Sequence, residues 1–242
     1  MELFCLGSSS SGNAYVFKQD NDCLLVECGF EFAKLVKKLH SRNIALTGIK
    51  AVVVTHEHND HSKALNDLEN FGIQNISSKN TDNNNQNQLL QHSTKFSLCS
   101  FPVCHDVVAF GYSITNETTK EKILFINDTS CLELPQEIKD TKYDYIFIEC
   151  NHVRKILREL IEQATDEHRY KLERQLKYHL SLAGTKKMLS YLDLSNTKAI
   201  YLMHLSQEAS DPKLMQQVVE SKFKIKTYIC KREGDFEWIR HY

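Results

Sequence analysis

The feature that most constrains this chain is a dense cluster of potential metal ligands placed directly after a hydrophobic strand. Ala51-Val52-Val53-Val54 is a continuous apolar run, which predicts a strand buried on both faces. His56-Glu57-His58-Asn59-Asp60-His61 follows almost at once. Imidazole nitrogens and carboxylate oxygens bind zinc, manganese or iron, and a loop leaving a strand can turn several of them toward one point. The sequence therefore predicts a metal site here rather than a polar loop with incidental histidines.

Three further candidate ligands lie at or just past the carboxyl end of a predicted strand. They are His105 after Lys95–Phe101, Asp128 after Lys122–Asn127, and His204 after Ala199–Met203. Each of them alone could be an ordinary surface or core residue. Open α/β sheets, however, bind ligands at the carboxyl ends of their strands. We therefore expect these three side chains to belong to the same metal site as the first cluster.

The hydrophobic periodicity elsewhere predicts a mixture of strands and helices. Further strands are expected at Glu2–Leu6, Ala14–Phe17, Cys23–Cys28, Val107–Thr115, Tyr143–Cys150 and Lys226–Cys230. Helices are expected at Phe30–Arg42, His61–Phe71, Val153–Tyr178 (one long helix or a pair), Ala183–Leu192 and Asp211–Lys222. Two halves of similar make-up are compatible with an α+β fold, a four-layer αββα sandwich, although other layered α/β architectures fit as well. We expect residues 1–242 to form a single domain, with a polar, Asn-rich flexible loop at about 77–92.

Composition narrows the class of protein. Hydrophobic residues make up 41% of the 242 residues and the formal net charge is −1, so no global field draws the chain toward nucleic acid or membrane. A nucleic-acid partner therefore requires a local basic patch. The eight cysteines form no C-x-x-C pair, and we expect free thiols in a reducing compartment. With neither a signal-peptide pattern nor an apolar run near the ~20 residues that span a bilayer, we expect a cytoplasmic protein without a membrane partner.

The spacing of these ligands resembles that of the metallo-β-lactamase superfamily of hydrolases. The pattern is Val-Val-Thr-His-x-His-x-Asp-His at residues 53–61, then a single His, an Asp-Thr and a late strand-end His. The resemblance implies that His56, His58 and His105 hold one divalent ion. It implies that Asp60, His61 and His204 hold a second, and that Asp128 bridges both. Zinc is the metal expected first, with manganese or iron as alternatives.

Four other motifs resemble the YycJ/WalJ group, whose relatives include ribonuclease Z and the PhnP phosphodiesterases. They are Gly7–Asn13, Glu149–His152, His179-Leu180-Ser181 and His204-Leu205-Ser206. The resemblance implies a phosphodiesterase or nuclease in which a metal-bridging hydroxide, oriented also by Asp60, attacks phosphorus. It further implies that His179, oriented by Glu149, donates a proton to the leaving group. The competing interpretation is that His179 only ends the charged helix before it.

Some departures from that pattern bear on the substrate rather than on the chemistry. Glu27 stands where an Asp is common, Asn127 replaces a Gly, and Gln207–Ser210 replaces an Asn-rich turn. DNA, RNA, a nucleotide or a small phosphodiester all remain possible substrates, and the polarity of cleavage and the oligomeric state are open. The charged stretch Val153–Lys177 is expected to be a solvated helix, and becomes a phosphate-binding track only if its basic residues gather toward the metals.

Two other functions fit the same ligands. A thioester or lactone hydrolase of the glyoxalase II type would use all seven of them. The second alternative is a non-catalytic binding subunit that metal only stabilises. Structural zinc sites usually close with four protein ligands, whereas seven ligands for two ions leave positions for water and substrate. The ligand count therefore favours catalysis.

Overall fold

The computed structural model describes residues 1–77 and 94–233, which fall into two compact units. Unit 1 comprises Met1–Ser100, Tyr112–Glu121 and Cys230–Tyr242, and unit 2 comprises Phe101–Gly111 and Lys122–Ile229. Apart from Ser77, the predicted flexible loop at about 77–92 lies outside the described residues. The expectation that the whole chain forms one domain stays a prediction.

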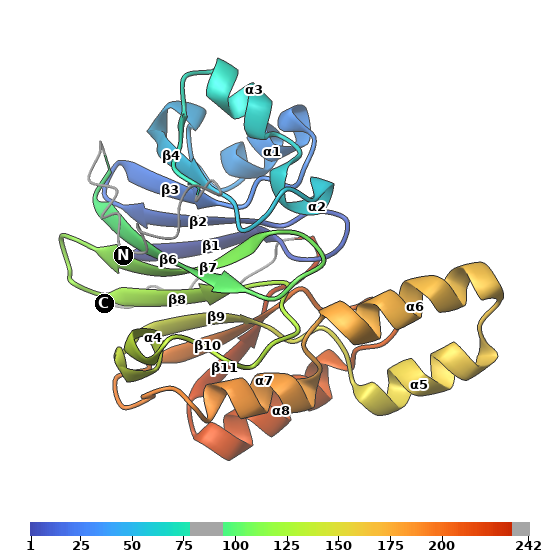
Figure 1. The fold of residues 1–242 in the computed structure, drawn as a ribbon. Helices are drawn as coiled ribbons and strands as arrows, with labels where there is room; N and C mark the ends of the chain where they lie inside the picture. Colours follow the sequence, from blue (N-terminus) through green and yellow to red (C-terminus); the bar gives the residue numbers. More distant parts are fainter. Residues whose placement is uncertain (78–93, 234–242) are drawn as a thin grey trace. The chain divides into compact units, whose positions relative to one another are not determined.

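Unit 1 is built on a five-stranded sheet in the order β1-β2-β3-β4-β5; Figure 1 labels the first four strands. The strands are β1 (Glu2–Gly7), β2 (Ala14–Gln19), β3 (Asp22–Val26), β4 (Ile49–Val53) and β5 (Gln74–Asn75). The first three pair antiparallel, and β4 pairs parallel with both β3 and β5. The helical segments of the unit are α1 (Phe32–His40), η1 (Leu46–Gly48), α2 (Asn59–Ser62) and α3 (Leu65–Asn70).

Both faces of the unit 1 sheet are buried. Val16, Leu25 and Val52 belong to a hydrophobic cluster that also contains Leu35 of α1 and Leu68 of α3. The residues that alternate with them along the strands are also 0% exposed. They are Tyr15, Phe17, Leu24, Val26, Ala51 and Val53. The prediction that 51–54 forms a strand buried on both faces is therefore confirmed for Ala51–Val53.

The segment predicted as one helix at His61–Phe71 is instead two short helices. The main-chain N–H of Ala64 donates to the carbonyl of Cys28 at 2.9 Å, and the carbonyl of His61 accepts from the N–H of Cys28 at 2.7 Å. These bonds to the end of β3 replace bonds that a continuous helix would need. The break between α2 and α3 therefore fixes the loop of candidate ligands against the neighbouring strand.

Unit 2 carries a parallel sheet made of β8 (Lys122–Ile126), β9 (Tyr145–Glu149), β10 (Ala199–Met203) and β11 (Lys226–Ile229). The full strand order is β11-β10-β9-β8-β7-β6, and the division between the units runs through β6 (Phe96–Val103) and β7 (Ala109–Asn116). Ile126 pairs with Ile148, and Ile148 pairs with Leu202. The carboxyl ends of β8, β9 and β10 are therefore level at one edge of the sheet.

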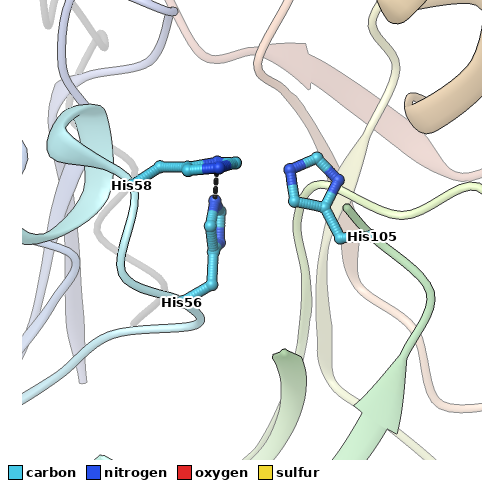
Figure 2. Close-up of side chains that lie close together, drawn as sticks. All are labelled: His56, His58 and His105. Atoms are coloured by element: carbon cyan, nitrogen blue, oxygen red, sulfur yellow. Dashed lines mark hydrogen bonds between the residues drawn. The ribbon is translucent and has the colours of Figure 1, made fainter. Parts of the chain in front are cut away.

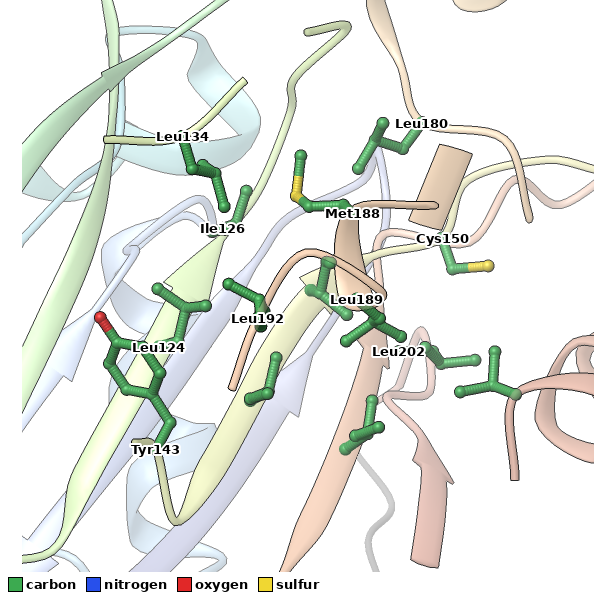
Figure 3. Packing of buried hydrophobic residues seen from close by; sticks show 14 of the residues in the cluster. Leu124, Ile126, Leu134, Tyr143, Cys150, Leu180, Met188, Leu189, Leu192 and Leu202 are labelled. Atoms are coloured by element: carbon green, nitrogen blue, oxygen red, sulfur yellow. The ribbon is translucent and has the colours of Figure 1, made fainter. Parts of the chain in front are cut away.

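A hydrophobic core supports this edge of unit 2. Ile148 and Leu202 belong to a cluster that includes Met188 and Leu189 of α7 (Leu182–Leu189) and Met215 of α8 (Pro212–Phe223). Figure 3 shows part of this packing, with Leu189 and Leu202 among the labelled side chains. The same cluster takes in Ile138 of the short helix α4 (Gln136–Asp140). The strands that carry Asp128, Glu149 and His204 are thus held by close packing.

The charged stretch predicted as one helix or a pair is a helical hairpin. It consists of α5 (Arg154–Gln163) and α6 (Asp166–Tyr178), which extend from the sheet of unit 2 (Figure 1). Leu157 and Leu172 pack together with Ala209 at the base of the pair. Ion pairs Lys155–Glu159 and Lys171–Glu167 lie on its surface, as a solvated helix predicts. Among the described residues, no helix combines the length and the apolar character needed to cross a bilayer.

Candidate metal centre

In unit 1 the loop after β4 brings together the histidines of the first motif. Nε2 of His56 lies 2.9 Å from Nδ1 of His58, with the rings nearly perpendicular at 83° (Figure 2, which also labels His105 of unit 2). The rings of His56 and His61 lie 4.1 Å apart between centroids, and Nε2 of His61 is 3.3 Å from a carboxylate oxygen of Asp60. All four predicted ligands of unit 1 therefore lie in one compact cluster.

A buried carboxylate orients two of these histidines. Glu27 is 0% exposed and accepts hydrogen bonds from the Thr55 hydroxyl at 2.6 Å and from Nδ1 of His61 at 3.0 Å. Because the Thr55 proton goes to Glu27, the Thr55 oxygen, 2.9 Å from Nδ1 of His56, is free to accept from that ring. Both rings thus direct Nδ1 at supporting groups, and Nε2 lies against another candidate ligand, His58 for His56 and Asp60 for His61.

From the sequence, Glu27 stands out only as a departure from a pattern, and this role is not evident. Glu27 also has a left-handed backbone, with φ of 62°, which non-glycine residues rarely adopt. The available signal was a single acidic residue within the apolar run Leu24-Leu25-Val26-Glu27-Cys28. A carboxylate in such a run needs hydrogen-bond donors when it is buried.

The Ser-rich turn between β1 and β2 contacts the loop of candidate ligands through its last residue, Asn13. Asn13 is 0% exposed, and its main-chain N–H donates to the carbonyl of Asp60 at 2.8 Å. Its side-chain Nδ2 donates to the same carbonyl at 3.1 Å and lies 3.3 Å from Nε2 of His61. Because an amide NH₂ can only donate, this contact favours an unprotonated Nε2 on His61. The turn therefore supports the candidate ligands Asp60 and His61 as well as connecting two strands.

We expect Gly29→Ala to disrupt this loop. An added Cβ at Gly29 would lie 1.7 Å from the carbonyl oxygen of Asp60, which is backbone and cannot rotate away. The free energy of unfolding should fall by about 3 kcal/mol or more, because overpacking against backbone forces the segment to move. Chemical denaturation measures this loss. Gly48→Ala is the matched control, since the nearest atom to its Cβ would be 3.8 Å away; equal stability of the two variants would contradict the prediction.

In unit 2 the level ends of three parallel strands gather a second cluster. Asp128 follows β8, Glu149 ends β9 and His204 follows β10. Nδ1 of His204 lies 3.0 Å from Oδ1 of Asp128 and 3.4 Å from Oε1 of Glu149. One ligand atom each of Asp128, Glu149, His179 and His204 lies within 4.8 Å of the others. The geometry thus places Glu149 and His179 directly beside two of the predicted metal ligands.

Glu149 holds His179 in a fixed orientation. Oε1 of Glu149 accepts from Nδ1 of His179 at 2.6 Å, and Oε2 accepts from the main-chain N–H groups of Thr129 at 3.1 Å and Leu180 at 3.0 Å. Burial acts to raise the pKa of Glu149, but the charge and hydrogen bond of His179 outweigh it and hold that pKa below its ordinary value. Burial likewise acts to lower the pKa of His179, yet the carboxylates of Glu149 and Asp128 raise it.

His105, the third predicted ligand of unit 2, lies near the same cluster. Its side chain is 1% exposed, and Nε2 lies 3.1 Å from Oδ1 of Asp106 and 3.8 Å from Oδ2 of Asp128. Burial lowers the pKa of His105 below its ordinary value, although Asp128 acts against this. The lowered pKa favours the neutral imidazole, which is the form that binds metal.

The donor sets fit divalent metal ions. Unit 1 offers three imidazoles and one carboxylate, and unit 2 offers His105, His204 and Asp128, with Glu149 and His179 beside them. Imidazole with carboxylate suits zinc and also manganese or iron. Carboxylates that accept a hydrogen bond from a ligand histidine, as Glu27 does from His61, are a regular feature of such centres.

Comparison with known proteins identifies the fold. A sequence profile described as the metallo-beta-lactamase superfamily matches residues 9–74. The crystal structure of the metallo-beta-lactamase fold protein YhfI from Bacillus subtilis matches with a TM-score of 0.66 at 15% identity, covering 98% of each chain. The chain has the metallo-β-lactamase fold. The fold predicted from the ligand pattern is therefore confirmed.

Two further proteins to which this chain is similar are nucleases by name. The exodeoxyribonuclease WalJ of Streptococcus pneumoniae is 27% identical over 225 residues, which cover 84% of this chain and 81% of WalJ. The short form of human tRNase Z matches in structure with a TM-score of 0.64 at 15% identity and covers 99% of each chain. The resemblance to the YycJ/WalJ group and to ribonuclease Z is thereby confirmed.

Proposed function

We propose that this chain is a metal-dependent phosphodiesterase that cleaves nucleic acid. The observation that carries the proposal is the Glu149–His179 pair, joined at 2.6 Å beside Asp128 and His204. Hydrolysis of a phosphodiester releases a poor leaving group, which needs a proton, and this pair can supply one. The relationship to the exodeoxyribonuclease WalJ supports nucleic acid as the substrate.

We propose the ligand set that the sequence implied: His56, His58 and His105 for one ion, and Asp60, His61 and His204 for the other, with Asp128 shared. When bound, two divalent ions would lower the pKa of a coordinated water and stabilise the charge that develops on the phosphate. Zinc is the metal proposed first, since imidazole dominates the donors.

The side chains around the metals have separate tasks. Glu27 fixes the ring of His61 directly and that of His56 through Thr55. Asp60, whose side chain is 24% exposed, is in a position to orient water as well as metal. Glu149 accepts the Nδ1 proton of His179, so Nε2 of His179 is the atom that delivers a proton to the leaving oxygen.

A direct test compares phosphodiester, thioester and lactone substrates on remetallated protein. We expect turnover of bis(p-nitrophenyl) phosphate that disappears with a chelator and returns with metal, and turnover of DNA or RNA oligonucleotides. Elemental analysis should find two equivalents of metal per chain. Hydrolysis of a thioester or a lactone without hydrolysis of the phosphodiester would instead identify a glyoxalase II type enzyme. Bound metal without any hydrolysis would indicate a non-catalytic subunit.

A further inference from the structure

The last turn of α6 contacts the residues that hold two of the proposed ligands. Gln175 donates from Nε2 to Oδ1 of Asn151 at 2.6 Å. Asn151, which is 5% exposed, donates from Nδ2 to the carbonyl of His204 at 2.8 Å, and the same Nδ2 lies 3.5 Å from Nδ1 of His204. Because Oδ1 accepts from Gln175, the NH₂ side of the amide must face His204.

This contact supports a strained residue. His204 has φ of 52°, a left-handed conformation that is unfavourable for a non-glycine residue and persists only when its surroundings enforce it. The bond from Asn151 to the carbonyl of His204 is one such constraint, and the N–H of Ser206 closes the loop by donating to the carbonyl of Asn151 at 2.8 Å. Gln175 thus acts on His204 through the orientation of one amide.

A neighbouring residue of α6 contacts the residue that holds His105, the other proposed ligand histidine of unit 2. Arg174 contacts Asp106 through two guanidinium nitrogens, with Nε at 2.9 Å from Oδ2. The other oxygen of Asp106, Oδ1, lies 3.1 Å from Nε2 of His105. The ring of Tyr178 meets that of His105 edge to face at 6.0 Å between centroids. Both guanidinium contacts go to Oδ2, so Arg174 holds that oxygen while Oδ1 is directed at His105.

We propose that Arg174 and Gln175 are positioning residues: Arg174 orients His105 through Asp106, and Gln175 orients His204 through Asn151. The inference rests on the proposed function, because it assigns these histidines to the two metal sites. It also gives the α5–α6 hairpin a task, since its end near the sheet is tied to one proposed ligand of each site. Substitution of each residue should therefore weaken the binding of a different metal ion.

Metal affinity measured directly provides the test. We expect Arg174→Ala and Gln175→Glu each to weaken one of the two Zn²⁺ equivalents roughly 10- to 100-fold, the usual effect of losing a residue that supports a metal ligand. Titration of the apoprotein against a chromophoric chelator resolves the two affinities. Gln175→Glu is nearly isosteric, but its carboxylate would face Oδ1 of Asn151 and turn that amide over. Arg174→Lys keeps the charge but offers one nitrogen in place of two, and its metal affinity should fall between those of Arg174→Ala and the parent protein.

Co²⁺ substitution separates positioning from general destabilisation. The visible spectrum of bound Co²⁺ should change in both variants, while the melting temperature of the apoprotein changes little. Arg158→Ala and Gln163→Glu, on exposed positions of α5, are the matched controls and should leave affinity and spectrum unchanged. Parent-like affinities and spectra in both α6 variants would overturn this inference and leave the proposed function intact. Failure of the parent protein to bind metal would overturn the proposed function itself.

Discussion

Replacing Asp60 with Asn, or His58 with Ala, is expected to lower metal-dependent phosphodiester hydrolysis by well over about 100-fold. Residues that only support a metal ligand typically cost 10- to 100-fold when changed, and a ligand should cost more. These two positions also suit the test structurally. His58 is half-buried and the side chain of Asp60 is 24% exposed, whereas His61 is 0% exposed and Asp128 2%. Loss of activity at the first two can therefore be separated from loss of fold.

The measurement is kcat/KM on bis(p-nitrophenyl) phosphate with added metal, together with metal content and a thermal melt. Glu57→Gln is the matched control, because Glu57 lies in the same loop with its side chain exposed. We expect that control to keep the activity and both metal equivalents. Full activity in folded Asp60→Asn protein would remove Asp60 from both of its proposed roles, as metal ligand and as orienting group.

The parts of the fold that the sequence predicted well are those governed by local patterns. β10 was predicted with its observed bounds, Ala199–Met203, because a fully buried parallel strand is a continuous apolar run. The break between α5 and α6, at Ala164 and Thr165, was allowed for but not located. The short helix α4 and the two-residue strand β5 were missed. Segments of that length bury too little to leave a periodic pattern.

The parts that the sequence missed depend on contacts between distant residues. The split between α2 and α3 arises from bonds to Cys28, more than thirty residues earlier. Glu27 reaches Thr55 and His61, and Arg174 reaches Asp106 from a helix 68 positions along the chain. Nothing in the local sequence around either residue specifies its partner. The proposed ligands can be selected from the sequence because metal binding needs particular side chains at strand ends, whereas supporting residues have many chemical solutions.

The two interpretations of His179 from sequence turn out to be compatible. His179 is the residue that follows the last turn of α6, so it does end the charged helix. It also lies 2.6 Å from Glu149, which is 0% exposed and bound by two main-chain N–H groups. A helix end held by a buried carboxylate gives a fixed ring, and a fixed ring is what proton transfer requires.

We therefore expect His179→Ala to lower the cleavage of nucleic acid by roughly 10²- to 10⁴-fold, the range for loss of a general acid. The effect should depend on the leaving group. p-Nitrophenolate departs without a proton, so turnover of bis(p-nitrophenyl) phosphate should fall far less than cleavage of an oligonucleotide, whose alkoxide must be protonated. Parallel kinetics on the two substrates measure this difference, and Lys177→Ala, on an exposed residue of the same turn, is the control.

Metal content decides between acid and ligand. His179 forms a group with Asp128, Glu149 and His204 whose ligand atoms lie within 4.8 Å of one another, close enough to share an ion. If His179 is the proton donor, the His179→Ala protein retains two metal equivalents and loses turnover selectively on the poor leaving group. An equal loss on both substrates, accompanied by loss of one metal equivalent, would instead make His179 a ligand. The leaving oxygen would then have to take its proton from water.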